Sequence, residues 1–431
     1  MLKIASRITP SNYLQFFQIA RYAGLFLSGV FLAKFGVSIN IIGQYEFILF
    51  LSGIISFFWI GGVFQTVLST YHSCDNKIEL LSKTISAQLA LGLISSLLAF
   101  LYLVFIDKKN NFNYQTIIAI TVYLLLNTLT FFNENYYLIK EKYNKLTLYA
   151  IGNFSLQILA ILIVIIVDPS IKNFIYALLC ISIWKTIILM YNLWVEKIKV
   201  SLIPDIGFLK LCSPLIAGIL ISGSSDYIDS FLVLHNFGSE SFAIFKFGAK
   251  EFPLSLLLAN SLSMAMIPSI VKKENINDGI NELKSQGERL MNILFPITWV
   301  FLISSKYLYP IIFSSQFSDS AAIFNVYLLL VISRTIFPQT VVMASQRRDI
   351  ILNTAYWEIT INVFSSLILM WKFGIIGIAY GTVVAFLSEK LILAYRLKKL
   401  NVDFQQYTNF SKWFLFTVIT VLLYFFVENF L

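Results

Sequence analysis

Long apolar runs alternate with short polar connections along almost the whole chain of 431 residues. A helix needs roughly 20 apolar residues to cross the hydrocarbon core of a bilayer, and most of the runs reach that length. Transmembrane barrel strands are about half as long and alternate apolar with polar positions, which these runs do not do. The pattern therefore predicts an all-α, polytopic membrane protein. Thirteen spanning helices are expected, at residues 12–35, 44–71, 83–106, 114–139, 146–167, 173–195, 213–237, 241–271, 289–313, 320–344, 351–371, 375–396 and 411–427.

A polar segment at 196–211, which contains a proline and a glycine, is the best internal boundary. The first predicted hairpin on each side of it turns at a Phe–Gly pair, Phe35–Gly36 and Phe237–Gly238. This likeness is a weak sign of an internal repeat of the kind that many transporters contain. We expect two domains, residues 1–200 and residues 201–431. Each would hold a six-helix bundle, and the second would carry an additional C-terminal helix.

Composition and charge agree with this pattern. The chain is 58% hydrophobic and 13% charged, which excludes secreted disulfide scaffolds, disordered proteins and nearly all soluble enzyme folds. With the N-terminus inside, twenty Lys and Arg residues fall in cytoplasmic segments and five in the opposite loops. The net charge of +9 is therefore a topology signal that places the N-terminus in the cytoplasm, and no nucleic-acid partner is expected. The expected location is a bacterial plasma membrane, crossed many times.

Extramembrane chemistry has little room in this sequence. No predicted loop is long enough to fold as a soluble catalytic or nucleotide-binding domain, and there is no phosphate-binding P-loop motif. The three cysteines have no metal-ligand spacing, and the apolar start lacks the pattern of a cleavable signal. We expect no catalytic residues, no metal and no cofactor other than a coupling ion, H⁺ or Na⁺.

Several charged residues lie inside predicted spans. A charge at the bilayer centre costs at least about 2.5–3.5 kcal/mol on insertion scales, so it is rarely present without a function. Arg21, Lys185 and Arg334 lie on three different predicted helices, and none has an acidic neighbour one helical turn away. Arg binds phosphate through its planar fork and Lys binds it as a point charge. These three cations therefore predict a site for a diphosphate head group.

Acidic and basic residues also face one another across the hairpin at Gly238. Asp226 and Asp229 share a face of the helix before that glycine, and Lys246 and Lys250 share a face of the helix after it. Equal spacing from the turn places Asp229 level with Lys246, and Asp226 level with Lys250. We expect two ion pairs there, with Lys250 as a further cavity cation and Asp226, Asp229 and Glu251 as candidates for ion coupling. The alternative is that these pairs only hold helices together.

Four features resemble a known family, the polysaccharide flippases of the multidrug/oligosaccharidyl-lipid/polysaccharide (MOP) exporter superfamily. The first stretch, FLAKFGVSINIIGQYEFI, looks like the glycine turn and Gly-x-Tyr of the family's first hairpin. The second, SPLIAGILISGSSDYIDSFLVLHNFGSESFAIFKFGAKE, is similar to its proline-led helix 7 with an Ile-Asp pair. The third, SQRRDIILNTAYWEITINVFSSLILMWKFGIIGIAYGTVVAFLSE, looks like its loop–helix–glycine pattern. The fourth is the spacing of the helices.

The resemblance implies two pseudo-symmetric six-helix bundles in a V arrangement around a cationic cavity, with an extra helix at the C-terminus. It implies export of an undecaprenyl-diphosphate-linked oligosaccharide, an O-antigen type of cargo, from the cytoplasmic to the outer leaflet by alternating access. By position, Asp229 matches the acidic residue of the Ile-Asp motif, whereas Arg21, Lys185 and Arg334 match no fixed motif. Membrane lipid is then an obligatory partner, and other glycan-assembly proteins are candidate partners.

Three other functions stay open at the level of the sequence. A multidrug cation antiporter of the same superfamily would favour an acidic, aromatic cavity with few cations. A membrane-embedded polysaccharide polymerase or glycosyltransferase would need a sizeable extramembrane loop. A purely structural partner in a glycan-assembly complex would not need isolated charges at the midplane.

Overall fold

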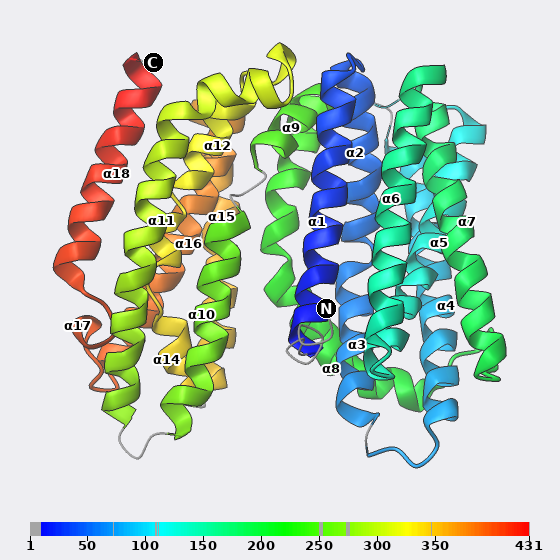
Figure 1. The fold of residues 1–431 in the computed structure, drawn as a ribbon, viewed down its shortest axis with the longest axis horizontal. Helices are drawn as coiled ribbons and strands as arrows, with labels where there is room; N and C mark the ends of the chain where they lie inside the picture. The colour runs from blue at the N-terminus through cyan, green and yellow to red at the C-terminus, as the bar shows by residue number, and fades with distance from the viewer. Residues whose placement is uncertain are drawn as a thin grey trace, which may run out of the picture. The chain divides into compact units, whose positions relative to one another are not determined.

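The computed structural model describes residues 10–71, 73–107, 110, 112–249, 253–272, 276–345 and 347–430. Every regular element in these ranges is helical, as the apolar runs predicted (Figure 1). The chain forms two compact units, Met1–Gly223 and Ser224–Leu431. The all-α, polytopic fold class is confirmed.

The first unit contains eight α-helices and one short π-helical turn among the described residues. They are α1 (Pro10–Lys34), α2 (Ile39–Ile54), α3 (Phe57–Thr70), α4 (Lys77–Leu101), η2 (Tyr102–Ile106), α5 (Tyr114–Ile139), α6 (Tyr143–Val167), α7 (Ile171–Val195) and α8 (Ile206–Gly223). Helix α5 packs against α4 and α7, and α1 packs along α6.

The second unit has the following elements in the described ranges. They are α9 (Ser225–Gly248), α10 (Pro253–Lys272), α11 (Ile276–Ile312), η3 (Ser315–Phe317), α12 (Ser320–Leu328), α13 (Val331–Arg334), α14 (Pro338–Ala344), α15 (Arg348–Phe373), α16 (Ile375–Lys398), α17 (Phe404–Tyr407) and α18 (Phe410–Phe430). The antiparallel pair α15 and α16 forms its most extensive helix contact, and α18 packs on α11.

Eight helices in the described part of the chain are long and apolar enough to cross a membrane. Two bent pairs raise that number to ten: α2 with α3, bent by 42°, and α12–α13 with α14, bent by 43°. The three other expected spans lie at 213–237, 241–271 and 351–371. The first of these is not one helix, because α8 ends at Gly223 and α9 begins at Ser225. Glycine and serine are weak helix formers, so the break falls where the sequence GSS interrupts the apolar run.

Both expected glycine turns are present. Gly36 between α1 and α2 has φ +72°, and Gly238 inside α9 has φ +81°. This left-handed backbone favours glycine because a Cβ would clash with the neighbouring carbonyl. Gly238 therefore divides α9 into two helical arms without ending it.

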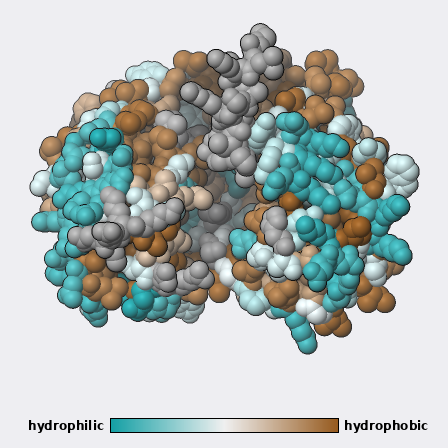
Figure 2. Space-filling view, turned by 60° about the horizontal axis from the view of Figure 1, so that its bottom comes forward, coloured by the Kyte–Doolittle hydropathy of each residue, from teal (hydrophilic) through white to brown (hydrophobic). Residues whose placement is uncertain are grey.

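The polar ends of the first unit differ in charge. The connections α3–α4, α5–α6 and α7–α8 lie at one end, and hydrophilic residues gather on the end that faces the viewer in Figure 2. That end bears the basic residues Lys77, Lys83, Lys140, Lys142, Lys145, Lys197 and Lys199. Among the described residues of the opposite connections and their flanks, Lys34 and Lys172 are the basic ones. The surplus agrees with the expectation that the first end is cytoplasmic.

Helix α8 belongs to the first compact unit, although the expected domain boundary at 200/201 precedes it. It packs closely on α3. A Cβ added to Gly62 would lie 2.6 Å from both the Cα and the backbone nitrogen of Ile216 on α8. Small residues at such a crossing let two backbones approach closely, which is a main source of helix association in membranes.

We predict that Gly62→Ala destabilises the protein by about 1–3 kcal/mol, because the new methyl group overlaps backbone atoms that cannot rotate away. Gly218→Ala, on α8 itself, is the matched control, since its added Cβ meets nothing within 4 Å. Thermal unfolding in detergent measures both. Equal stability of the two variants would show that α3 and α8 are not in close contact.

Candidate functional site

Arg21 on α1 forms an ion pair with Glu134 on α5. Its guanidinium also lies over two aromatic rings, 4.9 Å from the centroid of Phe17 and 5.8 Å from that of Phe131. The side chains of Arg21 and Glu134 retain 31% and 16% of their exposure. Arg21 is thus held from several sides, and its cation is balanced by the carboxylate of Glu134.

Lys185 lies near the middle of α7 and is directed toward α5. Its Nζ is 3.3 Å from the Oδ1 of Asn127, whose amide nitrogen donates to the hydroxyl of Ser52 on α2 at 3.1 Å. The charges of both Glu134 and Arg21 act on Lys185, so the three ionisable side chains belong to one electrostatic cluster. We call Arg21, Glu134 and Lys185 the charge cluster. With both bases protonated and the carboxylate ionised, it carries a net charge of +1.

Amide side chains continue this polar interior toward the end of α5 and α7 that bears the surplus of basic residues. The amide nitrogen of Asn133 donates to the backbone carbonyl of Lys185 at 3.0 Å. The amide nitrogen of Asn192 donates to the Oδ1 of Asn133 at 3.0 Å and also reaches the hydroxyl of Tyr137. Asn133 and Asn192 are buried, so these bonds satisfy groups that would otherwise be costly to remove from water. The backbone that bears Lys185 is therefore fixed.

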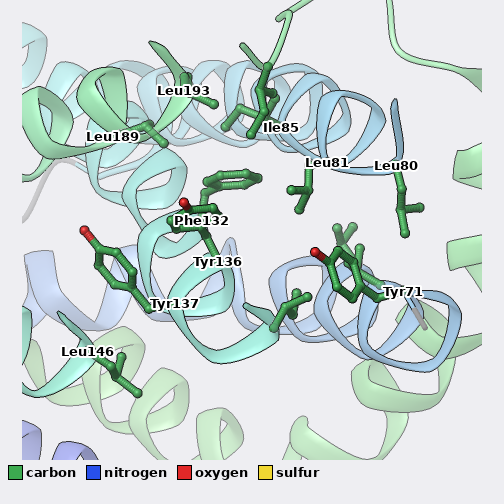
Figure 3. Close-up of a cluster of buried hydrophobic side chains, with 14 of the residues drawn as sticks. Tyr71, Leu80, Leu81, Ile85, Phe132, Tyr136, Tyr137, Leu146, Leu189 and Leu193 are labelled. Atoms are coloured by element: carbon green, nitrogen blue, oxygen red, sulfur yellow. The ribbon is translucent and has the colours of Figure 1, made fainter. Parts of the chain in front are cut away.

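A second ionic group lies at this basic end of the same helices. Glu196, directly after α7, accepts hydrogen bonds from Tyr136 at 2.6 Å, Lys140 at 3.0 Å and Lys142 at 2.9 Å. Figure 3 shows a cluster of buried hydrophobic side chains in the same unit, which includes Tyr136 and Tyr137 of α5 and Leu189 and Leu193 of α7. Burial alone would raise the pKa of Glu196, but the three donors outweigh it and lower the pKa to about 2.

The pH dependence of this end follows from that sign. The pKa of Glu196 is lower in the folded protein than its ordinary value. Its contribution to the stability of the folded protein is therefore present above about pH 4.5 and is lost as the pH falls toward 2. We predict that Glu196→Gln speeds amide hydrogen exchange at residues 137–142 about tenfold at pH 7 and removes this pH dependence. Because the intrinsic rate of amide exchange itself falls on acidification, the readout is the protection relative to that rate, and a protection that still falls on acidification of the variant would assign the effect to another group.

Asp229 is a buried carboxylate of the second unit, with 5% of its surface exposed. It lies on α9 and accepts hydrogen bonds from the hydroxyl of Tyr327 on α12, at 2.9 Å, and from that of Thr382 on α16. Three helices of the unit thus meet at one carboxylate. Hydroxyl and carboxylate oxygens are ligands that suit a hard monovalent cation, and a carboxylate can also bind a proton.

Two basic residues that the sequence analysis singled out in the second unit, Arg334 and Lys246, lie beside aromatic rings. Arg334 is the last residue of α13, where the chain bends before Pro338, and its guanidinium lies 5.4 Å from the ring centroid of Phe386 on α16. The ammonium group of Lys246 lies 5.5 Å from the ring centroid of Phe242. Arg21 and Lys185 therefore come together in the first unit, whereas Arg334 and Asp229 belong to the second.

Part of the expected site falls outside the described residues. Lys250 and Glu251 are not described, and nothing is described of the side chain of Asp226. The expected Asp226–Lys250 pair therefore lies outside the described residues, and the expected Asp229–Lys246 pair stays a prediction. Within the described ranges, no group of three or more His, Cys, Asp or Glu side chains could hold a metal ion.

Solved structures match almost the whole chain. "Lipid II flippase MurJ, inward closed conformation" is matched with a TM-score of 0.71 and 18% identity, over 97% of this chain and 93% of that one. An outward-facing multidrug transporter of the MATE family gives 0.57 and 12%, over 92% and 98%. The fold is that of the MOP superfamily transporters. A further member, from Pyrococcus furiosus, gives 0.54 and 11%, over 92% and 97%, and its title reports a reversed polarity of the binding pocket.

Neither a protein-family model nor a curated protein matches the sequence. At 18% identity and below, these likenesses establish the fold. They agree with the all-α, polytopic fold class that the sequence predicted, whereas the cargo has to be argued from the side chains.

Proposed function

We propose that this protein is a flippase that moves an undecaprenyl-diphosphate-linked oligosaccharide from the cytoplasmic to the outer leaflet by ion-coupled alternating access. The observation that carries the proposal is the charge cluster, a net positive group on three helices of a MOP-type fold. The structure with the highest TM-score reported above is a lipid II flippase by its title, which supports a lipid-linked cargo.

The physical need for such a cluster is clear. A diphosphate that enters hydrocarbon without partners loses its hydration, which costs many kcal/mol. Fixed cations in a hydrated cavity replace the lost water, while the prenyl chain of the cargo stays in the bilayer. Arg21 on α1 offers a planar fork that matches two phosphate oxygens, and Lys185 on α7 offers a point charge.

Glu134 gives the cluster two states. Without cargo, it neutralises Arg21, so the empty protein does not hold a bare pair of cations in the membrane. An arriving diphosphate carries more charge than one carboxylate and displaces Glu134 from the guanidinium. The cargo and the empty protein therefore favour different arrangements of α1 and α5, and such differential binding is what drives a change between conformations.

Leaflet exchange in proteoliposomes tests this function. A fluorescent lipid-diphosphate oligosaccharide is incorporated in both leaflets, and the fraction reached by an external quencher is followed over time. We expect the intact protein to accelerate exchange over protein-free vesicles. Uptake of an organic cation without lipid exchange would instead identify a multidrug antiporter, and polymer formed from lipid-linked sugars would identify a polymerase.

Asp229 is the proposed coupling residue for H⁺ or Na⁺. We predict that Asp229→Asn exchanges cargo at the rate that the intact protein shows after both ion gradients are collapsed, because the amide keeps the hydrogen-bonding shape but not the charge. Glu240→Gln, an exposed position on the same helix, is the matched control and should keep the response to the gradients. Ion coupling through Asp229 would be contradicted by either of two results. One is an Asp229→Asn variant whose exchange rate still responds to the gradients, and the other is an intact protein whose exchange rate responds to neither gradient.

The proposed setting is a bacterial plasma membrane with the N-terminus in the cytoplasm. The surplus of basic residues at one end of the first unit supports this orientation. Other glycan-assembly proteins are proposed partners, since a lipid-linked oligosaccharide must be made before it is moved and consumed afterwards.

A further inference from the structure

An open groove of about 750 Å³ lies at the cytoplasmic end of α7, away from the charge cluster. One part of it is apolar, formed by Met190, Trp194 and Val195 at the end of the helix, and the other part is formed by Lys197 and Lys199. Trp194 keeps 78% of its surface exposed and Met190 63%. A basic rim thus borders an apolar wall at the depth of the membrane–water interface.

The backbone that carries the two lysines is fixed. Helix α7 ends in a tight turn, in which the amide of Ile198 donates to the carbonyl of Leu193 at 2.9 Å and Lys197 takes a left-handed φ of +54°. The chain then runs along α4, where the amide of Lys199 donates to the hydroxyl of Ser82 at 3.2 Å. The backbone amide of Ser201 donates to the hydroxyl of Ser86 at 2.9 Å. Both ammonium groups therefore extend from anchored positions.

The groove has an uncompensated positive charge. Lys197 and Lys199 are exposed, and among the described residues no carboxylate lies within ion-pair distance of either. The neighbouring carboxylate, Glu196, is already bound by Lys140 and Lys142, which together exceed its charge. An anion at the groove meets no competing partner from the protein.

We propose that this groove binds the head group of an anionic phospholipid of the cytoplasmic leaflet. The phosphate would lie between Lys197 and Lys199, the indole of Trp194 at the level of the glycerol, and one acyl chain along the exposed face of α7. That face continues the apolar wall into the membrane, with Ile187 65% exposed and Tyr191 56%. Charge and apolar surface adjoin in one place, which suits an amphiphile held at the interface and not a free anion.

This groove differs from the charge cluster in its charged side chains and in its position, which is the end of α7 and the segment after it. It holds two flexible ammonium groups at the interface, with no arginine fork, and it is open along its side. Its occupant is a resident lipid held at the end of α7 and the segment that follows it. The proposal does not depend on the flippase function.

Lipid titration of the full chain tests the proposal. The purified protein is titrated with phosphatidylglycerol, with phosphatidylcholine and with inorganic phosphate, and bound lipid is counted by native mass spectrometry. We expect a preference for phosphatidylglycerol that Lys197→Gln/Lys199→Gln reduces about 10–30-fold, since each lysine near an anionic surface contributes about tenfold or less. Inorganic phosphate should not compete at matched concentration.

The control variant is Lys34→Gln/Lys172→Gln, which removes two exposed lysines from the opposite end of the same unit. It should keep the affinity of the intact protein. Equal affinity for the two lipids, equal losses in the two double variants, or full competition by inorganic phosphate would each overturn the proposal.

Discussion

Arg21→Ala is expected to lower leaflet exchange of the lipid-linked cargo about 10–100-fold. A charge-assisted hydrogen bond contributes about 1.5–3 kcal/mol, and each 1.4 kcal/mol corresponds to a factor of ten. The same change leaves Glu134 without its guanidinium partner in a half-buried place. Stability should therefore fall as well, by about 1–3 kcal/mol, which is less than for a fully buried pair.

A second variant separates these two effects. In Arg21→Gln/Glu134→Gln both charges are replaced by amides of similar shape, so no unpaired charge remains. We expect thermal stability to return to within about 1 kcal/mol of the intact protein, because removal of both partners of an ion pair is often nearly neutral. Exchange should stay low, since the fork for the diphosphate is absent. Recovery of exchange together with stability would show that the pair only joins α1 to α5.

Lys185→Met is expected to reduce exchange about 10–100-fold while it leaves the protein as stable as before, or more so. An ammonium group inside a helical bundle is costly to desolvate, and a methionine of similar length removes that cost. Nothing but function then explains the presence of the lysine. Exchange and thermal unfolding are measured on the same preparations.

The matched control for Lys185→Met is Lys172→Met, an exposed position at the start of the same helix. It should change neither exchange nor stability. A loss of exchange equal to that of Lys185→Met would point to a general effect of charge on α7, and a stability loss in Lys185→Met would make the lysine a structural residue.

The apolar runs predicted most helices closely because a continuous span has a simple composition. The span expected at 114–139 coincides with α5, and that expected at 173–195 differs from α7 by two residues at its start. The bend between α2 and α3 was not predicted, because a bent span has the same apolar content as a straight one. The bend before α14 has a signal in the sequence, Pro338, since a residue before proline avoids the helical conformation.

The candidate site was less accessible to sequence reasoning. Arg21 and Glu134 are 113 residues apart, and no periodicity links positions on different helices. The single hint was energetic, because a lone arginine inside a membrane calls for a partner. Lys185 was found from the sequence because its neighbours on α7 are apolar, whereas its partner Asn127 carries no charge that would have marked it.

Helix α8 shows a further limit. Its sequence follows the polar segment that marks the boundary of the expected repeat, yet its packing partner is α3. The fit depends on the absence of a side chain at Gly62, and glycine pairs also occur where helices merely bend. Close approach of two backbones is a property of both helices together, and one helix alone does not reveal it.

The most direct test of the central claim is the affinity of the purified protein for a short-chain prenyl diphosphate. We expect Lys185→Met and Arg21→Gln/Glu134→Gln each to weaken binding at least tenfold, while Lys172→Met binds as the intact protein does. Equal affinity in all four proteins would contradict the account, because the charge cluster would then have no part in holding the diphosphate.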